Sequence, residues 1–194
     1  MNTPAHVAVN AFLLGRGRFA QRAAAIALGA ALPDLPILGF YLYQRFGLGA
    51  SERSIWSHTY FQPPWQALFD AFHSLPLIAL TALLAWRSRR TALLACALSM
   101  ALHVAFDLPL HGEDSHAHFW PLSDWHFRSP VSYWDPRLHG RAVALVELAA
   151  SLAACVAVWR RGGQWRWIAG GVGALYAVGI AVAVGWWSSL HAHG

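Results

Sequence analysis

The most informative stretch of the sequence is residues 103–121, which read HVAFDLPLHGEDSHAHFWP. An apolar segment ends here, and the stretch holds four histidines and three acidic residues within nineteen positions. If the apolar part is a helix, His103 and Asp107 lie one turn apart on the same face. An imidazole and a carboxylate so placed suit zinc or a similar divalent metal. The same HxxxD spacing also fits a simple helical ion pair, so the rest of the chain must decide between the two.

The segment that follows this helix is rich in His, Trp and acidic residues and is punctuated by Gly and Pro, which favours a loop. We expect the loop, residues 111–141, to cover the site. His111 is a candidate additional metal ligand, and His118 is a candidate group for proton transfer, because both follow closely on the HxxxD helix. His116 is expected to be solvated.

The composition is that of a membrane protein. Of 194 residues, 57% are hydrophobic and only 12% are charged, and the mean hydropathy is +0.38, which is unusual for a soluble domain. All 14 basic residues are Arg, and most of them stand in short clusters between apolar runs. This pattern indicates membrane topology, and no nucleic-acid partner is expected.

Six apolar runs predict an all-α, multi-pass transmembrane helical bundle of about six segments, in which residues 1–194 form one integral-membrane domain. These runs cover residues 4–14, 23–43, 65–86, 91–110, 142–159 and 167–187. The second is broken by Pro33-Asp34-Leu35-Pro36, which needs a polar partner inside the protein. If the segments alternate in direction, every Arg cluster falls on one side, which the positive-inside rule makes cytoplasmic. We therefore expect a bacterial inner-membrane protein whose site faces the periplasm.

Five of the runs carry an ionisable side chain at a similar distance from the nearest Arg cluster. At a helical rise of roughly 1.5 Å per residue, that distance is roughly 15–21 Å. In a hydrocarbon layer of about 30 Å, this level lies past the midplane, near the outer leaflet. Buried charges in a membrane usually pair or bind something, so we predict one or two divalent ions, with zinc as the expected metal. The predicted ligands are His6, Asp34, His73, His103, Asp107, His111 and Glu147.

Other roles stay open for some of these side chains. Three neutralising His–carboxylate pairs would also account for the buried charges, and Glu147 could instead pair with His139 or Arg141. Asp70, three residues before His73, could orient that imidazole through a hydrogen bond, serve as a ligand, or act as a general base. In the loop, the arginines 128, 137 and 141 are available to pair with a phosphate group.

Taken in order, several short motifs resemble a known family. They are His6, Pro33-Asp34, His73-Ser74, the HxxxD of residues 103–107 and Trp120-Pro121. Over roughly residues 1 to 125 they look like the bacterial membrane-bound metal-dependent hydrolases of the YdjM-like group. More distantly, they are similar to the zinc-dependent phospholipase C and single-strand zinc nuclease superfamily, which implies a helical zinc site with phosphodiester chemistry.

The chain departs from these patterns in two places. Asp70 stands in a neighbourhood where the YdjM-like group commonly has a further His. The second HxxxE of the phospholipase type is missing, because Val143 stands four residues before Glu147.

We therefore expect a membrane-embedded metal-dependent hydrolase that acts on a phosphoester, or another ester or amide bond, of a lipid or amphiphilic substrate. Asp70 or His118 would handle protons. The partners of the protein would be membrane lipids and a lipid-like or phosphorylated small molecule. The rivals are a metal-ion transporter or metal sensor, and a structural membrane protein stapled by metal. A hydrolase keeps one open side facing the headgroups, whereas a transporter needs polar access from both faces.

Overall fold

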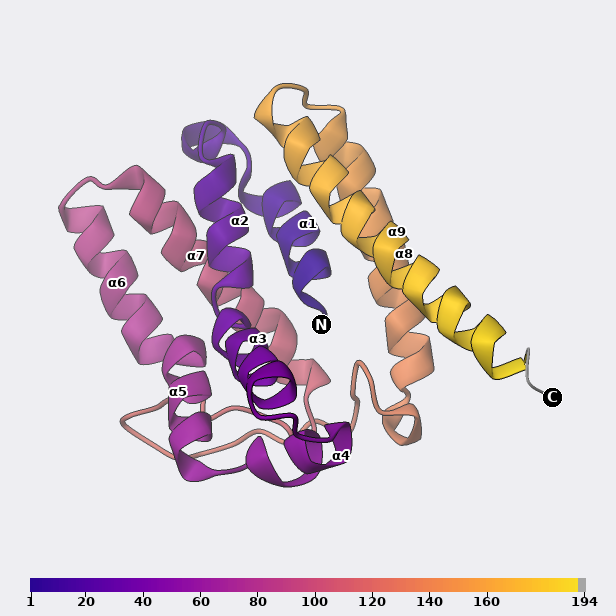
Figure 1. Cartoon of the computed structure of the whole chain (residues 1–194). Coiled ribbons are helices and arrows are strands. Elements are labelled where there is room, and N and C mark those ends of the chain that lie inside the picture. The colour runs from indigo at the N-terminus through magenta and orange to yellow at the C-terminus, as the bar shows by residue number, and fades with distance from the viewer. Residues whose placement is uncertain (192–194) are drawn as a thin grey trace.

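The structure, a computed structural model, describes the backbone of residues 1–191 and the side chains of residues 1–181, and this part contains helices and no strand (Figure 1). The expected all-α class is confirmed. The α-helices are α1 (Thr3–Leu14), α2 (Ala23–Ala31), α3 (Leu35–Leu42), α4 (Glu52–Ser54), α5 (Pro63–His73), α6 (Leu75–Arg87), α7 (Thr91–Asp107), α8 (Gly140–Trp159) and α9 (Gln164–His191). Short 3-10 or π turns cover Gly17–Phe19, Tyr43–Gly47, Ile55–Thr59, Leu108–Leu110 and Pro136–Leu138.

In the part of the chain that the structure describes, fewer helices could cross a membrane than the six that the sequence predicts. Among the described residues, three stretches are long and apolar enough, namely Pro63–Arg87, Thr91–Leu110 and Gly140–Trp159. The pair Ala23–Ala31 and Leu35–Gly47, bent by 56°, adds a fourth if it counts as one span. With its 12 residues, α1 is only about 18 Å long, too short to span. The expected span 167–187 runs past residue 181 and so lies partly outside the described side chains.

Proline-containing breaks place polar side chains at helix ends. The break between α2 and α3 contains Pro33 and Asp34. A second break, at Ser74, separates α5 from α6, because the ring of Pro76 in a continuous helix would clash with the carbonyl four residues before it. There the backbone of Ser74 is extended, and its hydroxyl accepts a hydrogen bond from the amide of Leu77 at 3.2 Å, which caps α6.

Close packing joins α1, α2 and α7, the helices around the candidate site. A Cβ atom at Gly29 in α2 would overlap the backbone carbonyl of Cys96 in α7, so only glycine permits this approach. Buried polar groups add a second link. The side-chain amide of Asn10 in α1 donates to the Ser99 carbonyl in α7 at 2.8 Å. The Ser99 hydroxyl donates to the Ile26 carbonyl in α2 at 2.7 Å. These contacts fix the mutual positions of the three helices.

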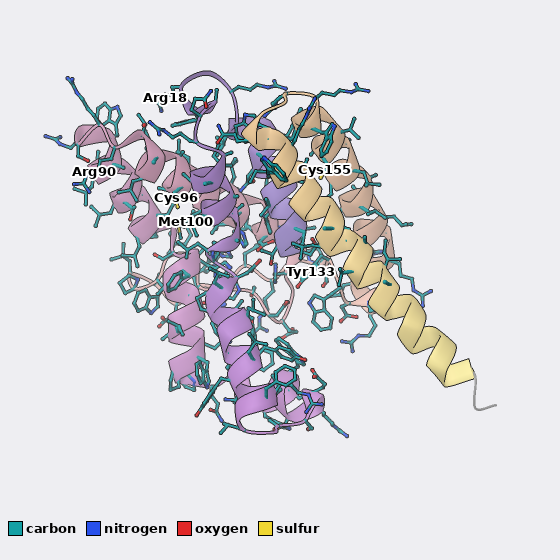
Figure 2. All side chains as sticks on the ribbon, turned by 45° about the horizontal axis from the view of Figure 1, so that its top comes forward. Arg18, Arg90, Cys96, Met100, Tyr133 and Cys155 are labelled. Carbon is teal, nitrogen blue, oxygen red and sulfur yellow. The ribbon has the colours of Figure 1, made fainter. Side chains whose placement is uncertain are left out.

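The two ends of the bundle differ in character. The turns α1–α2, α6–α7 and α8–α9, which hold the Arg clusters, gather at one end (Figure 1), where Figure 2 labels Arg18 and Arg90. The segment between α7 and α8 runs across the other end. Between the ends, the outer faces expose large apolar side chains, for example Leu145, Val146 and Leu152 on α8. Such extended apolar surface marks a membrane or protein interaction.

Candidate metal centre

Four side chains that are distant in the sequence converge on one point. Asp34 lies in the break between α2 and α3, His73 ends α5, and His103 and Asp107 occupy the last turns of α7. One donor atom from each of the four lies within 4.8 Å of those from the other three. His73, His103 and Asp107 are buried, whereas the Asp34 side chain is 24% exposed. The centre is therefore open to the outside at Asp34.

Backbone carbonyls orient both imidazoles. Nδ1 of His103 lies 2.7 Å from the Ala30 carbonyl, and Nδ1 of His73 lies 2.8 Å from the Phe69 carbonyl. Because a carbonyl oxygen can only accept, both Nδ1 atoms carry a proton, and each neutral ring has its lone pair on Nε2. Both Nε2 atoms are buried and lack a hydrogen-bond partner. A metal-binding histidine typically has its other ring nitrogen held in this way.

The Nε2 atom of His103 faces two carboxylates. It lies 3.0 Å from Oδ2 of Asp107 and 3.5 Å from Oδ1 of Asp34. A neutral imidazole with its lone pair on Nε2 would repel two ionised carboxylates, so either a proton, on His103 or on a carboxyl group, or a metal ion must lie between them. A metal ion would also satisfy Nε2 of His73, which a proton on His103 would not. The donor set, two imidazoles and two carboxylates, fits a divalent metal such as zinc.

Asp107 also faces a second group of donors through its other oxygen. Oδ1 lies 2.9 Å from Nε2 of His6, 3.6 Å from Nε2 of His111 and 2.5 Å from the amino nitrogen of Met1. The ring of His6 stacks on that of His103, with a centroid separation of 3.6 Å. The structure thus brings two more of the predicted ligands, His6 and His111, to the edge of the four-residue centre.

Hydrogen bonds hold the loop against the α5–α6 junction. The buried Asp70 carboxylate accepts the amide of Ala117 at 3.0 Å and lies 3.4 Å from Nδ1 of His116. The amide of Leu75 donates to the His118 carbonyl at 2.8 Å, and the Ser74 hydroxyl donates to the Trp120 carbonyl.

The expectation of a solvated His116 is wrong. Its side chain is 2% exposed, and its ring stacks on the ring of His73 with the centroids 3.9 Å apart. The loop therefore covers the centre directly through this residue. The loop is held by Asp70, which is far away in the sequence, so the burial of His116 cannot be predicted from the residues next to it.

Two other loop histidines have perturbed ionisation. Burial, together with the neighbouring His116, lowers the pKa of His118 to about 4, and neither of its ring nitrogens has a hydrogen-bond partner. Burial alone would lower the pKa of His111, but hydrogen bonds to Asp107 and Asp114 raise it to about 9. His118 is therefore neutral at pH 7, with a lone pair free to accept a proton.

The structure does not bring Glu147 into the four-residue group. Its carboxylate accepts the amide of Asn2 at 3.1 Å and also binds the Asn2 side chain. The pairing partner of Glu147 is thus Asn2, neither His139 nor Arg141.

Two of the loop arginines are engaged by carboxylates. The Arg137 guanidinium binds Asp135 at 2.7 Å, and Arg128 lies 3.5 Å from Glu113. Arg137 therefore has a carboxylate partner within the loop, and its side chain is 87% exposed.

Comparisons with known proteins add no relative. No family model matches the chain, and no curated protein or solved structure matches it either. The function must therefore be argued from the centre itself.

Proposed function

We propose that this chain is a membrane-embedded metal-dependent hydrolase and that Asp34, His73, His103 and Asp107 hold a zinc ion. One observation carries the proposal. The Nε2 atoms of His73 and His103 are buried without a hydrogen-bond partner and lie close to two carboxylates. Their Nδ1 protons are already donated to backbone carbonyls. A divalent metal at this point would supply Lewis-acid chemistry and lower the pKa of a water molecule bound to it.

The proposal allows a second ion beside the first. Asp107 has one oxygen toward His103 and the other toward His6 and His111. His6, His111 and Asp107 would hold such an ion, which would add Lewis-acid chemistry of the kind that two-metal enzymes use on phosphate esters. Glu147, held by Asn2, is not part of the proposed set.

The proposed substrate is an amphiphile with a phosphoester, or another ester or amide bond. The exposed edge of Asp34 leaves one side of the centre open, and the apolar outer faces of the helices favour a lipid environment. The Arg-rich turns support a cytoplasmic location for that end. The centre would then lie toward the periplasmic side of a bacterial inner membrane, within reach of lipid headgroups. Membership of the YdjM-like group remains part of this proposal.

Within this mechanism, the loop supplies the groups that handle protons and shape the site. His118 is buried, and neither of its ring nitrogens has a hydrogen-bond partner, so it is our candidate for the group that handles protons at the centre. Asp70 accepts from Ala117 and faces His116. Of the three roles open to Asp70, the geometry favours the first, a positioning role, in which Asp70 holds the loop in place rather than the ring of His73.

Transport is the rival reading, and the packing below the centre argues against it. Toward the Arg-rich end, the helices meet through apolar side chains such as Ile26, Leu94 and Ala95. The buried polar pair Asn10 and Ser99 is joined by its own hydrogen bonds. An ion leaving the centre in this direction would find no polar path among these residues.

The first test is metal content. Elemental mass spectrometry on detergent-purified protein should give stoichiometric zinc for wild type and a loss of at least most of it in His103→Ala and Asp107→Ala. The exposed residues His58 and Asp124 provide matched controls, His58→Ala and Asp124→Ala, which should keep the metal. Well-folded wild type that binds no zinc after reconstitution would overturn the metal centre.

A second test separates hydrolysis from transport. Zinc-loaded protein is assayed with a chromogenic phosphodiester and with phospholipid vesicles, and in proteoliposomes that contain a zinc-sensitive dye. We expect hydrolysis that His103→Ala abolishes. Zinc uptake into the proteoliposomes without any hydrolysis would favour the transporter instead.

A further inference from the structure

The Arg-rich end of the bundle carries charge that the protein does not neutralise. Nine of the 14 arginines lie in its three turns, namely residues 16, 18, 22, 87, 89, 90, 160, 161 and 166. All nine acidic residues lie elsewhere in the sequence, at positions 34, 52, 70, 107, 113, 114, 124, 135 and 147. Among the ion pairs of the described residues, none involves these nine arginines. Counter-anions for this end must come from outside the chain.

A cavity of about 580 Å³, wide open to the outside, lies at this end, between two turns that are far apart in the sequence. Its polar lining consists of Arg18, which precedes α2, of Arg87 and Arg89 from the α6–α7 turn, and of Thr91. Trp86 and Leu94 add apolar surface. This volume falls within the range of about 300–1,000 Å³ that is usual for small-molecule pockets.

The start of α7 adds to the positive potential of this cavity. The helix begins at Thr91, runs for 17 residues, and has no side-chain hydrogen bond at its N-cap, Arg90. The amide of Thr91 itself donates to the Arg89 carbonyl at 3.1 Å, and the dipole of the helix adds partial positive charge beside the three arginines. The hydroxyl of Thr91 accepts a hydrogen bond from Nε of Arg22 at 3.1 Å, which brings a fourth guanidinium to the rim.

We propose that this cavity binds one phosphate group, carried by a phospholipid headgroup or by a soluble phosphate compound. Guanidinium groups match phosphate oxygens in a bidentate geometry, and three of them line the cavity. The indole of Trp86, 61% exposed, would lie beside the glycerol or acyl part of a lipid. The site is independent of the proposed hydrolase, because His103 is twelve residues along α7 from Thr91, about 18 Å away.

The test compares two double variants that remove the same charge from the same end. Arg18→Gln with Arg89→Gln changes the cavity lining, whereas Arg160→Gln with Arg166→Gln changes the α8–α9 turn. Native mass spectrometry of the full chain measures binding of phosphatidylglycerol and phosphatidylcholine. The cavity variant should bind phosphatidylglycerol about tenfold more weakly than wild type, equal to 1.4 kcal/mol, and the control should stay within about twofold. Unchanged thermal unfolding and zinc content show that both variants are folded.

A calorimetric titration with inorganic phosphate distinguishes a lipid headgroup from a soluble phosphate compound as the ligand. Cavity-dependent binding of phosphatidylglycerol that millimolar phosphate does not displace identifies a lipid headgroup. Cavity-dependent binding of inorganic phosphate without lipid binding identifies a soluble phosphate compound. Equal weakening in the two double variants, or no binding of either probe to wild type, would overturn the proposal, because the arginines would then act as a diffuse belt.

Discussion

The ring of His116 lies flat against the ring of His73, with the centroids 3.9 Å apart. One of these histidines ends α5, and the other belongs to the loop that crosses the same end of the bundle (Figure 1). Asp70, one helical turn before His73, accepts the amide of Ala117 and lies 3.4 Å from Nδ1 of His116. The loop is thus attached to the helix that supplies a proposed metal ligand, so a change in the loop should be felt at the metal.

His116→Ala should weaken zinc binding although His116 is not a proposed ligand. Residues that orient ligands typically cost roughly 10- to 100-fold in metal affinity when they are removed. Competition with a chromophoric chelator measures this affinity, and His58→Ala is the control because His58 is exposed. Asp70→Asn should have a smaller effect than Asp70→Ala, since the amide oxygen can still accept from Ala117. Wild-type affinity in His116→Ala would mean that the loop is not coupled to the centre.

Removal of the metal should destabilise the wild-type protein. A ligand that binds only the folded state stabilises it by about 2.7 kcal/mol at a free concentration 100 times its Kd. Thermal unfolding in detergent, with zinc and with a chelator, should therefore show a higher midpoint with zinc. His103→Ala should show no such difference, since its centre lacks the ring that faces both carboxylates. Equal zinc shifts in the variant and in wild type would place the stabilising metal elsewhere.

Gly29 tests the close contact of α2 and α7. Gly29→Ala would push a methyl group into the Cys96 carbonyl, and overpacking of this kind costs roughly 1–3 kcal/mol. The added separation should also reduce zinc affinity, because α2 leads to Asp34 and α7 carries His103. In contrast, a Cβ at Gly39 in α3 meets nothing within 4 Å, so Gly39→Ala should leave stability unchanged or raise it by about 0.5–1 kcal/mol. Thermal midpoints and chelator competition of both variants decide the question.

The sequence predicts the helical class and much of the centre because both depend on regular periodicity. Distance along a helix from an Arg cluster predicts the level of a side chain. Three of the residues placed at one level, Asp34, His73 and His103, lie in the four-residue group, and the ring of His6 stacks on that of His103. The same calculation says nothing about the direction in which a side chain points. Glu147 shows this limit, because α8 packs on α1 and its carboxylate meets Asn2.

Two other features depend on long-range contacts that no window of sequence contains. His116 is buried because its loop binds Asp70, whose carboxylate is 47 residues away from the Ala117 amide that it accepts. Among the described residues, the number of candidate spans is below six because an apolar run can be bent or too short to cross a membrane. Residues 23–43 form a bent pair, and α1 stops after 12 residues.

Arg161 should stabilise the fold from the opposite end of the bundle. Its guanidinium donates to the carbonyls of Ala11 at 2.8 Å and Phe12 at 2.7 Å in the last turn of α1, where the Ala11 carbonyl also accepts the amide of Gly15. Hydrogen bonds to charged groups contribute roughly 1.5–3 kcal/mol, so Arg161→Gln should lower the thermal midpoint clearly. Arg160→Gln removes the same charge from the neighbouring, exposed residue and should have little effect. Because α1 also carries His6, the Arg161 variant should lose zinc more readily during heating, and equal midpoints for the two variants would show that α1 is held by its apolar packing alone.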